Sequence, residues 1–563
     1  MKRFLLFLPP LLLTAAFPVR AHEGRPFCAT PLFQKHKVAL GQAVDRSVPQ
    51  QPTVKRDTPT VGDTTSFWAW DLTVMPPAWI MVPATCRAVG EYCYVFVADD
   101  QWNVNMDSTD VALVVEKFDH STPGDSTRGI YEIDTDTFGP APDELDNDPK
   151  IYIFYSALGC FGGSCFDGYF SVFNEYTEEA AQHEGGHSNE VEMFYMSCDP
   201  IDPTANSTLS VLAHEFEHMI HWNMDPDEDA WVDEGCAEYA MYLYGYPDPI
   251  SGFPDDPDDD LTVWDQAWTD YIQTYLWTMY VAEHFGGDAT ITALVAEPGN
   301  SITGVENTLA DQGYPETFED VFVDWTMANV LDDPSIDEGQ YGYAWIDLPP
   351  FAATQHGSYP VPSTQSTVNN WAADYIRLVN GESLTLYYTG RNNSFFSVPL
   401  LKLDDTAPTT VQYTVLDSLQ DGVFSLPTFG TAYDTLIMVS AHISAEGGDL
   451  YSYWTDELTD VLAGAGTAPN PASPVLFQNE PNPFNPATKI AFGVPARAYI
   501  RLGVYDVTGE LVADLVGGTI EPGTHSVIWD GRDRSGSPAA PGVYFSRLEA
   551  GGRVLTKKMV MVK

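Results

Sequence analysis

Residues 207–222, Ser-Thr-Leu-Ser-Val-Leu-Ala-His-Glu-Phe-Glu-His-Met-Ile-His-Trp, contain the pattern that decides the fold around the candidate site. Apolar residues from Leu209 to Ile220 recur at three- and four-residue steps, which predicts a helix with one buried face. His214 and His218 are one helical turn apart, so both imidazoles project from the same side of this helix. Two imidazoles in this arrangement can bind a single metal ion.

Zinc is the metal that this arrangement predicts, because neutral imidazole is one of its preferred ligands. Glu215 follows the first histidine and is predicted to be the general base that accepts a proton from water. A third protein ligand is expected from the helical segment Trp231–Ala240, and Glu234 is the choice. Glu238, one turn further on, is expected to accept a hydrogen bond from a ligating imidazole, although an exchange of roles between these two glutamates stays open.

Two other histidine patterns are given no metal role. His221 is seven residues from His214, about 10 Å along a helix axis, which is too far to complete the same site. The segment His183-Glu184-Gly185-Gly186-His187 is a second literal match to the His-Glu-x-x-His pattern. Its adjacent glycines cost about 2 kcal/mol of helix propensity relative to alanine, so it is expected to be a loop that enters a strand.

The rest of the chain alternates between strand-like and helical patterns. Residues 64–198 are predicted to be rich in strands and residues 207–333 to be helical, which together indicate an α+β arrangement. The N-terminal strand-like runs are Tyr92–Val97, Val111–Val115 and Ile151–Tyr155. Period-two patterns return between 352 and 462 and again in the last 86 residues, and they predict two all-β sandwich domains.

These patterns predict six segments with defined boundaries. Lys2 and Arg3 precede an apolar run, which is typical of a secretory signal peptide. No later stretch is long and apolar enough to span a membrane. The predicted segments are a signal peptide (1–21), a propeptide or linker (22–62), a catalytic domain (63–350), a β-sandwich domain (351–463), a linker (464–477) and a C-terminal β domain (478–563).

The chain is strongly acidic, with 80 Asp and Glu against 26 Lys and Arg and a formal charge of −54. Between residues 22 and 477 there are 72 acidic and only 13 basic residues. This charge repels phosphate backbones, so nucleic acid and anionic membranes are not expected partners. Ca²⁺ is a candidate second ion in three acidic clusters, although a solvated acidic surface is the preferred interpretation. The clusters are Asp143–Asp148, Asp225–Asp229 and Asp255–Asp260.

Seven cysteines in an exported chain make disulfides expected. Cys86 with Cys93, and Cys160 with Cys165, are close enough in sequence to close short loops. The odd total leaves at least one cysteine outside an intramolecular disulfide. Cys28 is a candidate zinc ligand in a latent precursor.

The His214–His218 helix followed by Asp233-Glu234-Gly235 resembles the gluzincin metallopeptidases, above all the hyicolysin-type and immune-inhibitor-like secreted bacterial peptidases. The likeness covers roughly residues 64–345. Further matching segments are Ser188-Asn189-Glu190, Glu192–Tyr195, Tyr271–Trp277 and Phe318–Trp325.

This resemblance implies a thermolysin-like catalytic domain with a β-rich N-lobe and a helical C-lobe. It implies that His214, His218 and Glu234 bind zinc, that Glu215 is the base, and that a tyrosine lies near the oxyanion, with Tyr271 the first candidate and Tyr275 the second. The spacing from His218 to Glu234 is shorter than in thermolysin-like enzymes, where it would select Glu238. The local Asp-Glu-Gly motif is preferred because loops between helices change length easily.

The C-terminal segment 478–563 resembles FlgD-like immunoglobulin domains and type IX secretion sorting domains. The residues that carry this likeness are Pro481–Pro486, Val504–Gly509, Trp529–Gly531 and Gly542–Phe545. The resemblance implies export and a secretion machinery as a partner.

The predicted function is therefore that of a secreted or cell-surface zinc endopeptidase that acts on protein or peptide substrates. The alternative is an inactive surface protein for adhesion or binding that retains the helix as scaffold. Glu215 favours the enzyme, because a scaffold has no need of the general base.

Overall fold

The computed structural model describes residues 27–33 and 57–562 with internal gaps. The gaps are 75, 144, 162, 392, 405, 418, 446–449, 459–473, 477, 478, 480, 481, 483, 510, 521, 535, 536, 551 and 552. The predicted signal peptide 1–21 lies outside the described residues, as do most of 22–62 and of the predicted linker 464–477. Within the described residues, no helix is both long and apolar enough to cross a membrane.

The chain divides into two compact units. Of the described residues, the first unit comprises those up to 132 together with 141–219 and 265–268, and the second comprises 133–140, 220–264 and those from 269 onward.

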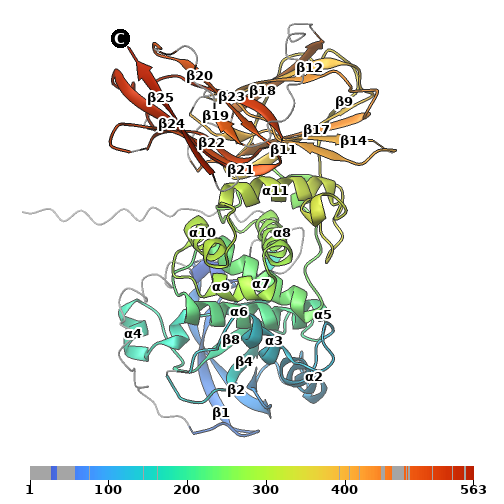
Figure 1. Cartoon of the computed structure of the whole chain (residues 1–563). Helices are drawn as coiled ribbons and strands as arrows, with labels where there is room; N and C mark the ends of the chain where they lie inside the picture. The colour runs from blue at the N-terminus through green and yellow to red at the C-terminus, as the bar shows by residue number, and fades with distance from the viewer. Residues whose placement is uncertain are drawn as a thin grey trace, which may run out of the picture. The chain divides into compact units, whose positions relative to one another are not determined.

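A six-stranded sheet forms the framework of the first unit, in the order β1-β2-β3-β4-β8-β7. Figure 1 labels β1, β2, β4 and β8 of this sheet. The central neighbours β3, β4 and β8 are parallel, and the remaining pairs are antiparallel. Every residue of β3, β4 and β8 is buried, as expected for parallel strands covered on both faces. The strands are β1 (Thr64–Asp71), β2 (Ala78–Val89), β3 (Cys93–Ala98), β4 (Ile151–Ser156), β7 (Gly168–Phe170) and β8 (Met193–Ser197).

The predicted strand at Val111–Val115 is wrong, because these residues belong to the helix α2 (Ser108–Asp119). Asp107 caps this helix by accepting hydrogen bonds from the amides of Thr109 and Asp110. Val111, Val114 and Phe118 then recur at helical spacing on the buried face. A short apolar run cannot by itself distinguish a buried strand from one side of a helix.

The helices fall where the three-to-four periodicity predicts them. Residues 209–220 lie mainly in α6 (Val211–Met224), and residues 271–285 lie mainly in α8 (Trp268–His284). Residues 318–331 form α11 (Phe318–Leu331). The other helices of this region are α5 (Asn206–Leu209), α7 (Ala230–Tyr244), α9 (Asp288–Val295) and α10 (Ser301–Asp311).

Two sheets that enclose one apolar core follow in the second unit, in the orders β10-β18-β12-β16 and β15-β14-β17-β11-β9. β16 alternates exposed and buried residues along its whole length, the pattern of a strand with one face on a core. The longer strands are β11 (Ala372–Val379), β12 (Leu384–Gly390), β16 (Asp421–Leu426), β17 (Thr435–His442) and β18 (Leu450–Glu457). The shorter ones are β9 (Thr354–His356), β10 (Thr364–Thr367), β14 (Leu400–Leu403) and β15 (Thr410–Gln412).

A further pair of sheets, β19-β20-β23 and β22-β21-β24-β25, encloses the core at the end of the chain (Figure 1). Trp529 is buried in this core and packs against Phe484 and Tyr544. The strands are β19 (Val475–Leu476), β20 (Thr488–Val494), β21 (Ala498–Tyr505), β22 (Leu511–Ile520), β23 (Gly523–Trp529), β24 (Gly542–Ala550) and β25 (Arg553–Met561).

The prediction of an α+β, thermolysin-like fold is wrong. Among the described residues, 33% are in strands and 26% in helices, so this part of the protein is mostly β-sandwich with a modest helical fraction. The physical reason is that helical periodicity is concentrated between α5 and α11, whereas period-two patterns persist over most of the remaining length. In the first unit, moreover, the strands form a mixed sheet with α2 and α3 (Ile130–Thr137) between the parallel strands β3 and β4.

Cys160 and Cys165 form a disulfide across the two-stranded ribbon of β5 (Cys160–Phe161) and β6 (Ser164–Cys165). The other proposed pair is not bonded, and Cys86 and Cys93 are buried free thiols. In the pairing of β2 with β3, Cys86 lies opposite Phe96, so register keeps the two cysteines apart.

A buried carboxyl pair in the first unit predicts a pH-dependent stability. Burial raises the pKa of both Glu192 and Asp146, which share a hydrogen bond. Above about pH 4 the unfolded carboxyls ionise while the folded pair keeps a proton, so the free energy of unfolding falls as pH rises. Glu192→Gln should flatten this fall, by up to about 1.4 kcal/mol per pH unit.

Urea unfolding at about pH 5 and about pH 8 measures this slope. Glu179→Gln, which changes an exposed glutamate of the first unit, is the matched control and should keep the wild-type slope. Identical slopes for Glu192→Gln and wild type would show that the pair does not hold the proton.

Candidate metal centre

Helix α6 presents His214 and His218 from one face into a buried site. Their ring centroids are 4.8 Å apart and the ring planes are nearly perpendicular, at 86°. Both residues are almost inaccessible to solvent, with exposed fractions of 2% and 1%. Phe216, on another face of α6, packs against Phe118 and Tyr131 and thereby fixes the rotation of the helix.

Two further donor groups converge on this histidine pair. Ligand atoms of Cys28, His214, His218 and Glu234 all lie within 4.8 Å of one another, and all four residues are buried. The sulfur of Cys28 is 3.7 Å from Nε2 of His218. Glu234 comes from α7, where Gly235 allows close packing: a Cβ there would lie 2.5 Å from Oγ1 of Thr278 in α8.

The chemistry of these four groups suits zinc. Two imidazoles, one carboxylate and one thiolate are ligand types that zinc accepts, and four is its usual coordination number in proteins. Softer or harder ions are less well matched, because copper(I) favours sulfur and calcium favours oxygen. Buried carboxylates are also costly unless a cation or hydrogen bonds compensate them, so a dication would stabilise the site.

Carboxylates also lie beside the Nδ1 atoms of the helix histidines. An oxygen of Glu217 is 3.9 Å from Nδ1 of His218, and Asp233 belongs to the same close group. Asp233 is in addition 3.6 Å from Nδ1 of His221. Such outer carboxylates orient ligating imidazoles. The sequence predicts this role for Glu238, and it stays a prediction.

Glu215 is fully buried and held from two sides. The hydroxyl of Thr30 donates a hydrogen bond to its Oε2 at 3.0 Å. Gly168 of β7 lies against its side chain, since a Cβ at this glycine would come within 2.9 Å of the Glu215 Cγ and Oε1 atoms. Burial, followed by the charge of Glu215, raises the pKa of Asp167 to about 7. The contacts with Thr30 and Gly168 therefore restrict the motion of the Glu215 carboxylate.

The predicted oxyanion tyrosines are both on α8 and both buried. Tyr271 packs edge-on against Trp264, with ring centroids 4.8 Å apart. Burial is the largest cause that raises the pKa of Tyr275, followed by the charge of Glu238. A contribution of Tyr271 to oxyanion stabilisation stays a prediction.

The second histidine motif is at a helix end, as its glycines indicated. Helix α4 (Glu178–His183) ends at its first histidine, and Gly185 has a positive φ of 80°. The His183 side chain is 82% exposed. His187 instead stacks on Trp68 at 3.7 Å and contacts Glu178 through Nδ1 at 2.7 Å. The two histidines therefore have surroundings unlike those of His214 and His218.

Two of the three acidic clusters accept hydrogen bonds from residues outside the cluster. Tyr94 donates to Asp148 at 2.8 Å, and the amide of Asn369 donates to Asp258 at 2.5 Å. These two hydrogen bonds partly satisfy Asp148 and Asp258. Calcium binding stays a prediction.

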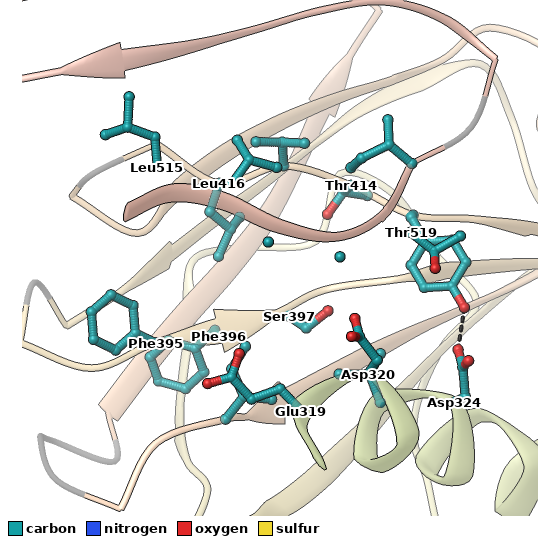
Figure 2. Close-up of a pocket in the computed structure, with 18 of the residues that line it drawn as sticks. Glu319, Asp320, Asp324, Phe395, Phe396, Ser397, Thr414, Leu416, Leu515 and Thr519 are labelled. Atoms are coloured by element: carbon teal, nitrogen blue, oxygen red, sulfur yellow. Dashed lines mark hydrogen bonds between the residues drawn. The ribbon is translucent and has the colours of Figure 1, made fainter. Parts of the chain in front are cut away.

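A separate pocket in the second unit lies between α11 and strands of the two sandwiches (Figure 2). Glu319, Asp320 and Asp324 line it from α11. Burial raises the pKa of Glu319 and of Asp324 to about 7. Asp324 accepts hydrogen bonds from Tyr413 and Gln340, so this carboxyl serves internal packing. None of the predicted site residues lines this pocket.

Several residues of the centre carry no signal in the sequence. Thr30 and Asp167 are far from the helix motif along the chain, and nothing in their local pattern marks them. Glu217 and Asp233 adjoin predicted ligands, but adjacency in sequence does not show which carboxylate faces a ring. Cys28 was a candidate on residue type alone.

Comparison with known families gives a match near the C-terminal end of the chain. Residues 482–552 match the FlgD Ig-like domain. This agrees with the paired sheets described above and with the resemblance noted from the sequence. No curated protein matches the chain.

Comparison with solved structures gives distant likenesses. PorZ, a surface component of the type IX secretion system of Porphyromonas gingivalis, is 16% identical, with a TM-score of 0.15. Latent PorU from the same organism is 15% identical, with a TM-score of 0.14. The alignments cover 29% and 38% of this chain but only 22% and 19% of those proteins. At such TM-scores neither likeness carries an argument about function.

The close approach of Gly168 to Glu215 predicts a stability defect in Gly168→Ala. The added methyl would overlap the Glu215 side chain and lie 3.1 Å from the Tyr195 carbonyl oxygen. Overpacking of this kind should lower the free energy of unfolding by about 1–3 kcal/mol.

Chemical denaturation measures this difference. Gly517→Ala is the control, because a Cβ at that strand glycine meets nothing within 4 Å. If both variants unfold at the wild-type midpoint, Gly168 does not constrain Glu215.

Proposed function

We propose that the protein is a secreted, zinc-dependent endopeptidase. The observation that carries this proposal is the convergence of His214, His218 and Glu234 donor atoms, all buried, beside the glutamate that follows the first histidine. Two histidines one helical turn apart with an adjacent glutamate suit metal-assisted hydrolysis.

In this proposal His214, His218 and Glu234 hold the zinc ion. Zinc, when bound, supplies Lewis acidity that activates water and polarises a carbonyl group. Glu215 accepts the proton of the attacking water and passes it to the leaving amine. The close contact with Gly168 restricts where the Glu215 carboxylate can lie. Tyr271 is proposed to stabilise the developing oxyanion.

The proposed setting is extracellular or at the cell surface. The charged and apolar pattern of residues 1–21 supports export, and the Cys160–Cys165 disulfide suits an oxidising compartment. A secretion machinery is the proposed partner of the FlgD-like C-terminal domain, as the resemblance to sorting domains suggests. The substrates are proposed to be proteins or peptides.

Glu215→Gln should separate metal binding from catalysis. The amide cannot accept the proton, so caseinolysis should fall by about 100- to 10,000-fold while about one zinc per chain is retained. Zinc content by elemental analysis and casein hydrolysis are the two measurements. Measurable hydrolysis that is equal in the variant and the wild type would contradict the proposed mechanism.

Substitution of either histidine motif identifies the metal-binding pair. His214→Ala removes a proposed ligand and should weaken zinc binding by roughly 100-fold or more. His183→Ala changes an exposed side chain at the end of α4 and should leave zinc affinity unchanged. A competition titration with a chelating indicator measures both affinities. Loss of zinc in His183→Ala, with retention in His214→Ala, would place the metal at the other motif.

A further inference from the structure

The segment that contains Cys28 lies in the candidate metal centre although it is far from the helix motif in sequence. Cys28 is 190 residues before His218, yet its sulfur is 3.7 Å from the Nε2 atom of that histidine. It also belongs to the group whose ligand atoms lie within 4.8 Å of one another. A thiolate is among the strongest zinc ligands in proteins, so this position is chemically suited to the metal.

A second contact of the same segment reaches the proposed base. Thr30, two residues after Cys28, donates a hydrogen bond to Oε2 of Glu215 at 3.0 Å. The amide of Phe170 in turn donates to the Thr30 hydroxyl at 2.8 Å, which fixes this side chain. The segment thus contacts a proposed zinc ligand and the proposed base at the same time.

Backbone hydrogen bonds connect the segment to the β5–β6 ribbon and to β7, the edge strand of the six-stranded sheet. The Phe27 amide donates to the Cys165 carbonyl and the Ala29 amide to the Gly168 carbonyl, both at 3.0 Å. β7 is the last strand in the order of the sheet, so its outer side is where an extended peptide could add. The segment occupies the edge that a peptide substrate would need.

Aromatic packing anchors both ends of the segment. Phe27 packs against Phe166, with ring centroids 4.8 Å apart. Phe33, in the short helix η1 (Thr30–Phe33), stacks on Trp70 at 4.8 Å and contacts Tyr169 edge-on. Both phenylalanines are buried, with exposed fractions of 6% and 5%. The segment is therefore a packed part of the first unit.

We propose that Cys28 is a zinc ligand and that residues 27–33 keep the enzyme latent. This inference rests on the proposed zinc peptidase function. On coordination the thiol loses its proton to solvent, and its sulfur takes the coordination position that a catalytic zinc must keep open. The Thr30 hydroxyl meanwhile donates a hydrogen bond to the Glu215 oxygen that would otherwise accept a proton from water. Release of the segment exposes the metal, the base and the sheet edge together.

Cobalt substitution tests the sulfur ligand without reference to activity. The full chain, loaded with Co²⁺ in place of zinc, should show a near-ultraviolet thiolate-to-cobalt charge-transfer band. Cys28→Ser should lose this band while it still binds cobalt. Cys86→Ser is the matched control, because Cys86 is another buried cysteine outside the disulfide, and it should keep the band.

Hydrolysis of casein by the zinc-loaded chains tests latency. A tethered inhibitory segment acts at an effective concentration in the millimolar range, so Cys28→Ser should raise activity about tenfold or more over wild type. Thr30→Ala should raise activity as well and keep the cobalt band. Activation in two variants of different residues would show that the gain does not come from misfolding of one of them. Cys86→Ser should match the wild type.

The outcomes separate this inference from the proposed function. Cobalt binding with a band that persists in Cys28→Ser, or unchanged activity in that variant, would overturn the latency proposal and leave the peptidase proposal intact. Failure of the chain to bind cobalt, or full activity of Glu215→Gln in the Cys28→Ser background, would overturn the peptidase proposal itself.

Discussion

Two imidazoles one helical turn apart, both withdrawn from solvent, impose the main constraint on the surrounding structure. Burial of His214 and His218 is favourable only if their nitrogens meet compensating groups or a metal ion. The Glu217 carboxylate beside Nδ1 of His218 and the converging Cys28 and Glu234 contribute to this compensation. The aromatic contacts of Phe216 hold the opposite side of α6, so the helix cannot rotate without loss of packing.

The edge of the first sheet connects this helix to the rest of the site. β7 brings Gly168 against Glu215, and the absence of a side chain at this glycine makes the approach possible. The same strand accepts the backbone of the segment around Cys28. Strand β7 thus contacts both the proposed base and the proposed inhibitory segment. The same strand therefore takes part in the proposed catalysis and in its proposed inhibition.

Local patterns predicted the helix of the site well, because its periodicity and its metal-binding spacing are both contained in a few turns. The strand predicted at Val111–Val115 is wrong, since the run is too short to separate strand from helix and the helix cap, Asp107, lies outside the run. The fold class was also wrong, because the order and direction of strands depend on contacts between distant residues. Thr30 and Glu215 are 185 positions apart, and no local pattern indicates that they meet.

A crystal of the zinc-loaded full chain, measured on both sides of the zinc absorption edge, gives the most direct test of the metal centre. An anomalous difference peak should lie about 2.0–2.1 Å from one ring nitrogen of each of His214 and His218. A peak at His183 and His187, or no peak at either pair in zinc-loaded crystals, would contradict the assignment of the metal centre to α6.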